Sequence, residues 1–98
     1  MDLSQWGEAE AAKVLATHAP AVKYHARRLR TLAARVGLDV EDLEAVGQVA
    51  VLEAVQLHSH DAVSIRTFVS RRVNQRLVDA LRTMSPLTRR GQQLAKLL

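Results

Sequence analysis

Residues 64–82 read SIRTFVSRRVNQRLVDALR, a segment in which an aliphatic stripe and a basic polar surface share one helix. Aliphatic residues at every fourth position fall on one face of an α-helix and indicate a side that packs on a core. They are Ile65, Val69, Val73, Leu77 and Leu81. The other side carries arginines, one amide and one aromatic ring, namely Phe68, Arg71, Arg72, Gln75, Arg76 and Arg82.

This second set favours nucleic-acid binding, because guanidinium groups bind phosphates, amides contact bases and aromatic rings stack on them. The charge distribution agrees. Residues 61–98 carry eight Lys or Arg against two Asp or Glu, whereas residues 1–60 carry six against eight. A basic half of this kind favours a polyanionic partner. The alternative is an ordinary solvated arginine face with Phe68 packed into the core.

The preceding segment, residues 39–57, reads DVEDLEAVGQVAVLEAVQL and is acidic at its start and apolar through its middle. Between Ala45 and Leu52 the single polar side chain is Gln48, so apolar atoms point in every direction around a helix. A domain of 98 residues can seldom cover a helix on all sides. We therefore expect one face to dock onto another protein, with Gly47 allowing a close approach. The alternative is a central core helix wrapped by the others.

Composition limits the remaining classes. The length supports one domain over residues 1–98, and the absence of cysteine excludes disulfides and thiolate metal sites. The start of the chain has no signal-peptide pattern, and no apolar run approaches the roughly 18 residues of a membrane span. We expect a cytoplasmic protein that does not contact membranes.

Glycine and proline are scarce and no alternating strand pattern occurs, so the sequence predicts an all-α, compact bundle of about five helices. Pro20 and Pro86 fit the first turn of a helix, where the missing N–H is not needed. Ser4, Asp39 and Ser64 are suitable N-caps. The expected helices span residues 5–18, 20–36, 40–58, 64–84 and 86–97, with Gly37 as a C-cap.

Several short segments in this order resemble region 2 of the sigma-70 family of bacterial transcription initiation factors, most closely the flagellar class. The segments are VEDL at 40–43, Gly47, VLEAV at 51–55, Thr67 with Phe68, and RVNQRLVDALR at 72–82, preceded by APAVKYHARRL at 19–29. The resemblance covers about residues 19–82 and implies the fold of sigma factor domain 2.

In that family the acidic and apolar helix binds the clamp of the RNA polymerase beta-prime subunit. The next helix binds the promoter minus-10 element as single-stranded DNA. The resemblance thus implies that the polymerase-binding residues are Asp42, Ala45, Val46, Gln48 and Leu52. It places Phe68, Arg71, Arg72 and Gln75 at the minus-10 element, and the helix face adds Arg76 and Arg82.

The chain also departs from the family pattern. Family members carry several aromatics along the DNA-melting helix, whereas Phe68 is the last aromatic residue here. Strand opening should therefore be weaker. Ala45 and Val46 stand where amide or acidic residues are common. After Arg82 there is room for about one more helix, so the domains that recognise further promoter elements are expected to be absent.

No P-loop, nucleophile elbow or acid-base pair occurs, and we expect neither enzymatic activity nor a cofactor. His58, His60 and Asp61 are closely spaced, but neighbouring loop residues rarely enclose a metal ion, so a solvated loop is favoured over a metal site. Two other hypotheses stay open. One is a sigma-like regulator that occupies polymerase or binds an anti-sigma factor without initiating transcription. The other is a helical protein that binds duplex DNA.

Overall fold

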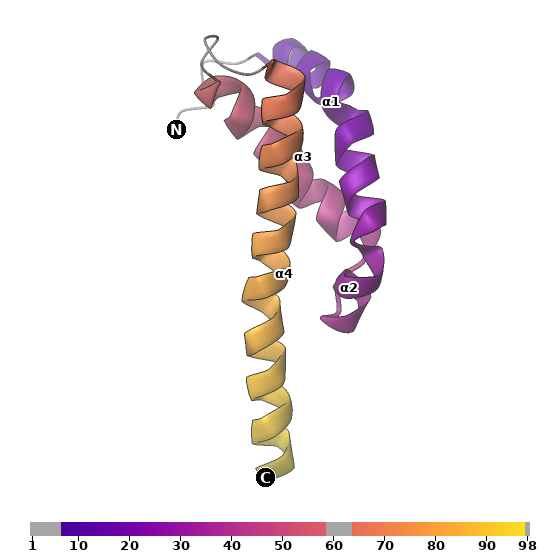
Figure 1. The fold of residues 1–98 in the computed structure, drawn as a ribbon, viewed down its shortest axis with the longest axis vertical. Helices are drawn as coiled ribbons and strands as arrows, with labels where there is room; N and C mark the ends of the chain where they lie inside the picture. Colours follow the sequence, from indigo (N-terminus) through magenta and orange to yellow (C-terminus); the bar gives the residue numbers. More distant parts are fainter. Residues whose placement is uncertain (1–6, 59–63, 98) are drawn as a thin grey trace.

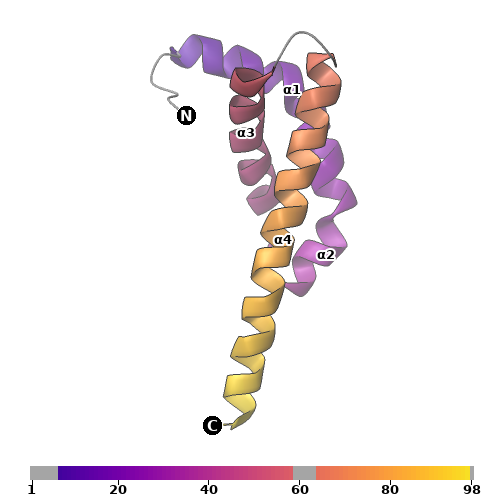
Figure 2. The same ribbon diagram turned by 60° about the vertical axis from the view of Figure 1, so that its left-hand side comes forward.

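The computed structural model describes residues 7–58 and 64–97, with the side chains of 7–58 and 64–84. These residues form four α-helices and no strand, which confirms the all-α prediction (Figure 1). The helices are α1 (Glu8–Arg28), α2 (Arg30–Arg35), α3 (Val40–Leu57) and α4 (Ile65–Leu97). Helices α1, α3 and α4 contact one another, and the C-terminal half of α4 extends beyond the other helices (Figures 1 and 2).

The predicted break at Pro20 is wrong, because α1 continues through this residue. An interior proline removes one helical hydrogen bond and bends the axis. Figure 2 shows the two halves of α1 running in different directions. His18 and Val22 are buried on either side of the proline, so packing holds both halves in helical form. The helix ends instead at Arg28, with Leu29 as its C-cap, and the predicted cap Ser4 lies outside the described residues.

The predicted break at Ser85 and Pro86 is also wrong, because α4 is continuous from Ile65 to Leu97. Two expected helices are therefore one. The missing N–H of Pro86 removes one hydrogen bond from a helix of 33 residues. The last residues of the helix, QQLAKL at 92–97, are strong helix formers that favour its continuation.

The predicted cap of α3 is confirmed. The backbone N–H of Asp42 donates to the Asp39 carboxylate over 2.8 Å. In return, the backbone N–H of Asp39 donates to the Asp42 carboxylate over 3.0 Å. This reciprocal pair is a capping box, which satisfies two backbone donors and fixes the start of the helix. At the start of α4, Ser64 Oγ accepts the N–H of Thr67 over 3.3 Å, as expected for its cap.

Gly37 ends α2 in the predicted way. Its φ of 82° lies in the left-handed region, where glycine carries no steric penalty. Its N–H donates to the Ala34 carbonyl over 3.2 Å, and the N–H of Leu38 donates to the Ala33 carbonyl over 2.9 Å. These two bonds form a Schellman motif, which turns the chain from α2 towards the cap of α3.

The core lies where α1, α3 and α4 meet. The predicted stripe of α4 is buried there, with Ile65 partly buried at its start. Gly47 of α3 lies against α1, because a Cβ built on it would stand 2.9 Å from Val22 Cγ1. The expectation that Gly47 faces a partner is therefore wrong. Its missing side chain lets two helices of this bundle approach each other.

Candidate functional site

Helix α3 has one buried and one exposed face. The buried residues are Leu43, Gly47, Ala50, Val51 and Ala54. Ala45 and Val49 are exposed on the other side, and Val49 keeps 46% of its accessible surface. The alternative of a core helix wrapped on every side is therefore wrong. An isolated exposed valine is ordinary, but here it belongs to a helix whose opposite face forms the core.

The five residues expected to bind polymerase are not equally accessible. Asp42, Ala45 and Gln48 are exposed, whereas Val46 and Leu52 are half-buried. Val46 packs against the core, which turns it away from the exposed face. One Asp42 oxygen is already engaged in the capping box.

Val49 was not among the predicted site residues, although its position could have identified it. Ala45, Val49 and Leu52 follow one another at intervals of four and three residues, which places them on one side of a helix. We call these three residues the apolar patch. Asp42 and Gln48 are exposed on the same helix and give the patch a polar border. This combination of an apolar centre and a polar rim is typical of protein interfaces.

On α4 the predicted DNA-binding residues separate into two groups. Arg71, Gln75 and Arg82 are exposed, and Arg72 is half-buried. We call these four residues the basic face. Arg76 lies on the flank towards α3, where its Nη2 donates to Glu53 Oε1 over 3.0 Å.

Phe68 is half-buried rather than openly displayed. It packs against the core, and its ring centroid lies 5.3 Å from that of His58. Part of the ring is therefore covered, as the alternative interpretation expected. His60 and Asp61 lie outside the described residues, so the loop predicted there is not described. In the part of the chain that is described, no three His, Asp or Glu side chains gather as a metal site would require.

Polar side chains that the sequence did not single out connect α1 to α4. His25 Nε2 and Ser70 Oγ lie 2.8 Å apart, and the Arg28 guanidinium donates to the Asn74 side-chain oxygen. Burial lowers the pKa of His25, and the positive charge of Arg28 lowers it further. These contacts fix the orientation of α4, and therefore of the basic face, relative to α1.

A family model described as Sigma-70 region 2 matches residues 14–85, a range that includes most of α1, all of α3 and the basic face. The chain belongs to the sigma-70 region 2 family. This domain is a non-enzymatic part of transcription factors, and membership supports a sigma-factor-like role in RNA polymerase binding and promoter recognition. The match concerns the family as a whole, so the flagellar class stays a prediction.

No curated protein and no solved structure matches the chain significantly. Among the described helices, none is both long and apolar enough to cross a lipid bilayer.

Proposed function

We propose that this sigma region 2 domain binds the beta-prime clamp of RNA polymerase through the apolar patch of α3. The observation that carries the proposal is the exposure of Val49 on a helix whose other face is in the core. Burying the exposed apolar surface of Ala45, Val49 and Leu52 against a partner would be favourable. Asp42 and Gln48 can supply polar contacts at the border, as in other protein interfaces.

The second part of the proposal assigns the promoter minus-10 element, as single-stranded DNA, to α4. Arg71 and Arg82 project from one rigid helix with no ion pair among the described residues, so both are available to phosphates. Gln75 can hydrogen-bond to a base edge from the same helix. Two contacts from α1 hold this helix in place: His25 with Ser70, and Arg28 with Asn74. A helix already held in position loses less entropy on binding.

Capture of core polymerase tests the role of α3. Val49→Glu places a charge in the apolar patch without disturbing the core and should abolish capture. Leu32→Glu is the matched control, because Leu32 on α2 is 49% exposed and lies outside the patch. The proposal for α3 fails if both variants retain polymerase, or if both lose it.

One observation favours a second candidate function. Phe68 is partly covered by His58 and the core, so the aromatic ring that would stack on an unpaired base is less accessible. This arrangement supports a sigma-like regulator that occupies polymerase, or binds an anti-sigma factor, without opening promoters. Transcription from a minus-10 promoter separates the two: polymerase binding without transcripts favours the regulator.

Both candidates act in the cytoplasm, where the polymerase works. The remaining hypothesis, a protein that binds duplex DNA independently of polymerase, requires a different result. It would be supported by tight binding to double-stranded DNA together with no capture of core polymerase. The same two assays therefore distinguish all three functions.

A further inference from the structure

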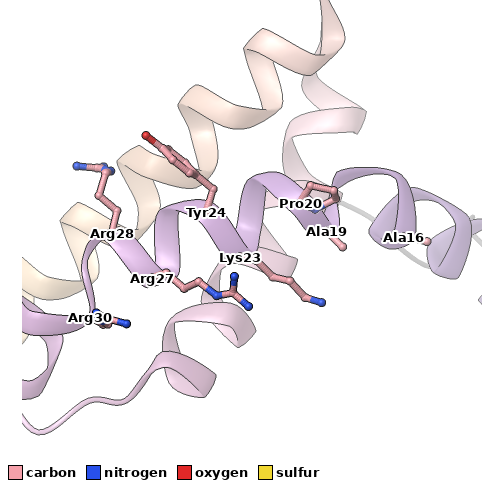
Figure 3. A pocket seen from close by; sticks show the side chains of 8 residues that line it. All are labelled: Ala16, Ala19, Pro20, Lys23, Tyr24, Arg27, Arg28 and Arg30. Atoms are coloured by element: carbon pink, nitrogen blue, oxygen red, sulfur yellow. The ribbon is translucent and has the colours of Figure 1, made fainter.

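The outer surface of α1 contains an open hollow of about 780 Å³ at the start of α2 (Figure 3). Small residues form part of its lining: Ala16, Ala19 and Pro20. The other lining residues have long side chains that extend beyond them: Lys23, Tyr24, Arg27, Arg28 and Arg30. We call this hollow with its eight lining residues the α1 site. It includes no residue of the apolar patch or the basic face.

The α1 site is strongly basic, although Glu44 of α3 lines a second hollow together with Lys23. Four of its lining residues are cationic, and none is acidic. Arg28 donates to Asn74, which is neutral. Lys23, Arg27 and Arg30 are exposed and form no ion pair with any residue that the structure describes. Clustered cations without carboxylate partners create a positive potential that attracts polyanions.

Tyr24 gives the α1 site an aromatic surface among these cations. Its side chain is 63% exposed. The ring lies edge-on to that of His25, with centroids 5.1 Å apart and an interplanar angle of 74°. His25 is hydrogen-bonded to Ser70 of α4, so the ring that Tyr24 contacts is held in place. Exposed aromatic rings beside arginines are the combination on which single-stranded nucleic acids bind.

We propose that the α1 site binds single-stranded nucleic acid, with Lys23 and Arg27 contacting phosphates and Tyr24 stacking on a base. The proposal rests on the DNA-binding role of α4 and extends it to a second surface. Arg28 connects the two, because it lines the α1 site and donates to Asn74, one turn beyond Arg71 on α4. A strand bound along α4 can therefore continue across this contact onto α1.

Binding of the full chain to a fluorescent single-stranded minus-10 oligonucleotide tests the phosphate contacts. Anisotropy is measured between about 50 and 200 mM salt, where the slope reports the number of phosphates contacted. K23Q/R27Q should make the slope shallower by about 1.4, since each contact on a single strand contributes about 0.7. K13Q/R35Q is the control, because it removes the same charge from exposed residues outside the α1 site.

Tyr24 is tested separately from the charges. Tyr24→Ala should weaken binding about tenfold, because base stacking is lost, without changing the salt slope. Tyr24→Phe keeps a ring and should restore the affinity. If Tyr24→Ala binds as the original chain does, the stacking contact is refuted.

Other results would overturn the α1 site. The first is that K23Q/R27Q and its control K13Q/R35Q weaken oligonucleotide binding equally. The second is that K23Q/R27Q weakens binding to the duplex of the same sequence as much as binding to the single strand. The third is that K23Q/R27Q abolishes polymerase capture and leaves DNA binding unchanged. The last result would indicate an acidic protein segment as the partner. R71A/R72A is measured in parallel. If it flattens the slope while K23Q/R27Q does not, the α1 site fails and the proposed role of α4 stands.

Discussion

The Arg76 guanidinium on α4 lies 3.0 Å from the Glu53 carboxylate on α3, and this ion pair joins the helices that carry the two proposed binding surfaces. The side chains are 46% and 25% exposed, so water and salt weaken the attraction. A pair of this kind contributes about 0.2–1 kcal/mol to stability. The ion pair has a larger effect on DNA binding, because it occupies the Arg76 guanidinium, which could otherwise contact a phosphate.

Glu53→Gln should therefore increase affinity for single-stranded DNA. The substitution releases Arg76 and removes a negative charge beside the basic face. If Arg76 then contacts one phosphate, the salt slope should become steeper by about 0.7. Oligonucleotide binding at several salt concentrations checks this. E53Q/R76Q is the control and should show no gain, whereas an equal gain in both variants would contradict the role of Arg76.

Replacing Arg71 and Arg72 with alanine should weaken DNA binding and leave the helical fold intact. Loss of two phosphate contacts should make the salt slope for a single strand shallower by about 1.4. The circular dichroism spectrum should stay unchanged, because Arg71 is exposed and Arg72 is half-buried at the surface. An unchanged slope would remove the basic face from the DNA-binding model.

Leu52→Glu should weaken polymerase capture but also reduce stability, because Leu52 is half-buried whereas Val49 is exposed. Placing a carboxylate in a partly apolar environment carries a desolvation cost. Thermal unfolding of both variants separates the effects: Val49→Glu should keep the original melting temperature, and Leu52→Glu should lower it. A folded Leu52→Glu that binds polymerase normally would exclude Leu52 from the interface.

The parts of this fold that depend on neighbouring residues were predictable from the sequence. The N-cap at Asp39 and the helix end at Gly37 are set within a few residues, and both predictions are confirmed. The stripe of α4 followed from its spacing. The helix breaks predicted at Pro20 and Pro86 were wrong, because the local cost of an interior proline is outweighed elsewhere in the same helix. Core contacts outweigh it in α1, and the helix propensity of the following residues outweighs it in α4.

Features that depend on which helices meet could not be read from the chain. Nothing near Arg76 in the sequence indicates that Glu53 lies beside it, 23 residues earlier. The same holds for Gly47 and Val22, since the glycine has a role only once α1 lies against α3. Val49 differs, because its spacing from Ala45 and Leu52 was sufficient to identify it.

Gly47→Ala should destabilise the fold through its contact with α1. The added Cβ would stand 2.9 Å from Val22 Cγ1, which is closer than a Cβ comes to a non-bonded atom in real proteins. Overpacking costs about 1–3 kcal/mol, which outweighs the roughly 1 kcal/mol that alanine adds to helix propensity. Val22→Ala provides the space, so the G47A/V22A double variant should be more stable than the sum of the single effects predicts. Urea unfolding of all four proteins checks this, and strict additivity would contradict the contact.

Stability should fall as the pH decreases below about 6.5, because two histidines are harder to protonate in the folded state. Burial lowers the pKa of His18 and of His25, and Arg66 and Arg28 respectively lower them further. The unfolded chain, with an ordinary pKa of 6.5, then binds more protons than the folded one, so the free energy of unfolding rises with pH in this window. The contribution of the two histidines to the free energy of unfolding should be fully present above the pKa of the unfolded chain. It should decline as the pH falls towards the lower pKa values of the folded state.

Urea unfolding at several pH values between about 5 and 7 measures this slope, since histidine is the only side chain with an ordinary pKa inside that range. His25→Gln removes one titrating group, and its amide can still hydrogen-bond to Ser70, whose Oγ lies 2.8 Å from His25 Nε2. The variant should therefore lose less stability than the original chain on acidification. If both lose the same amount, protonation of His25 is not coupled to unfolding, and the contact between α1 and α4 is insensitive to pH.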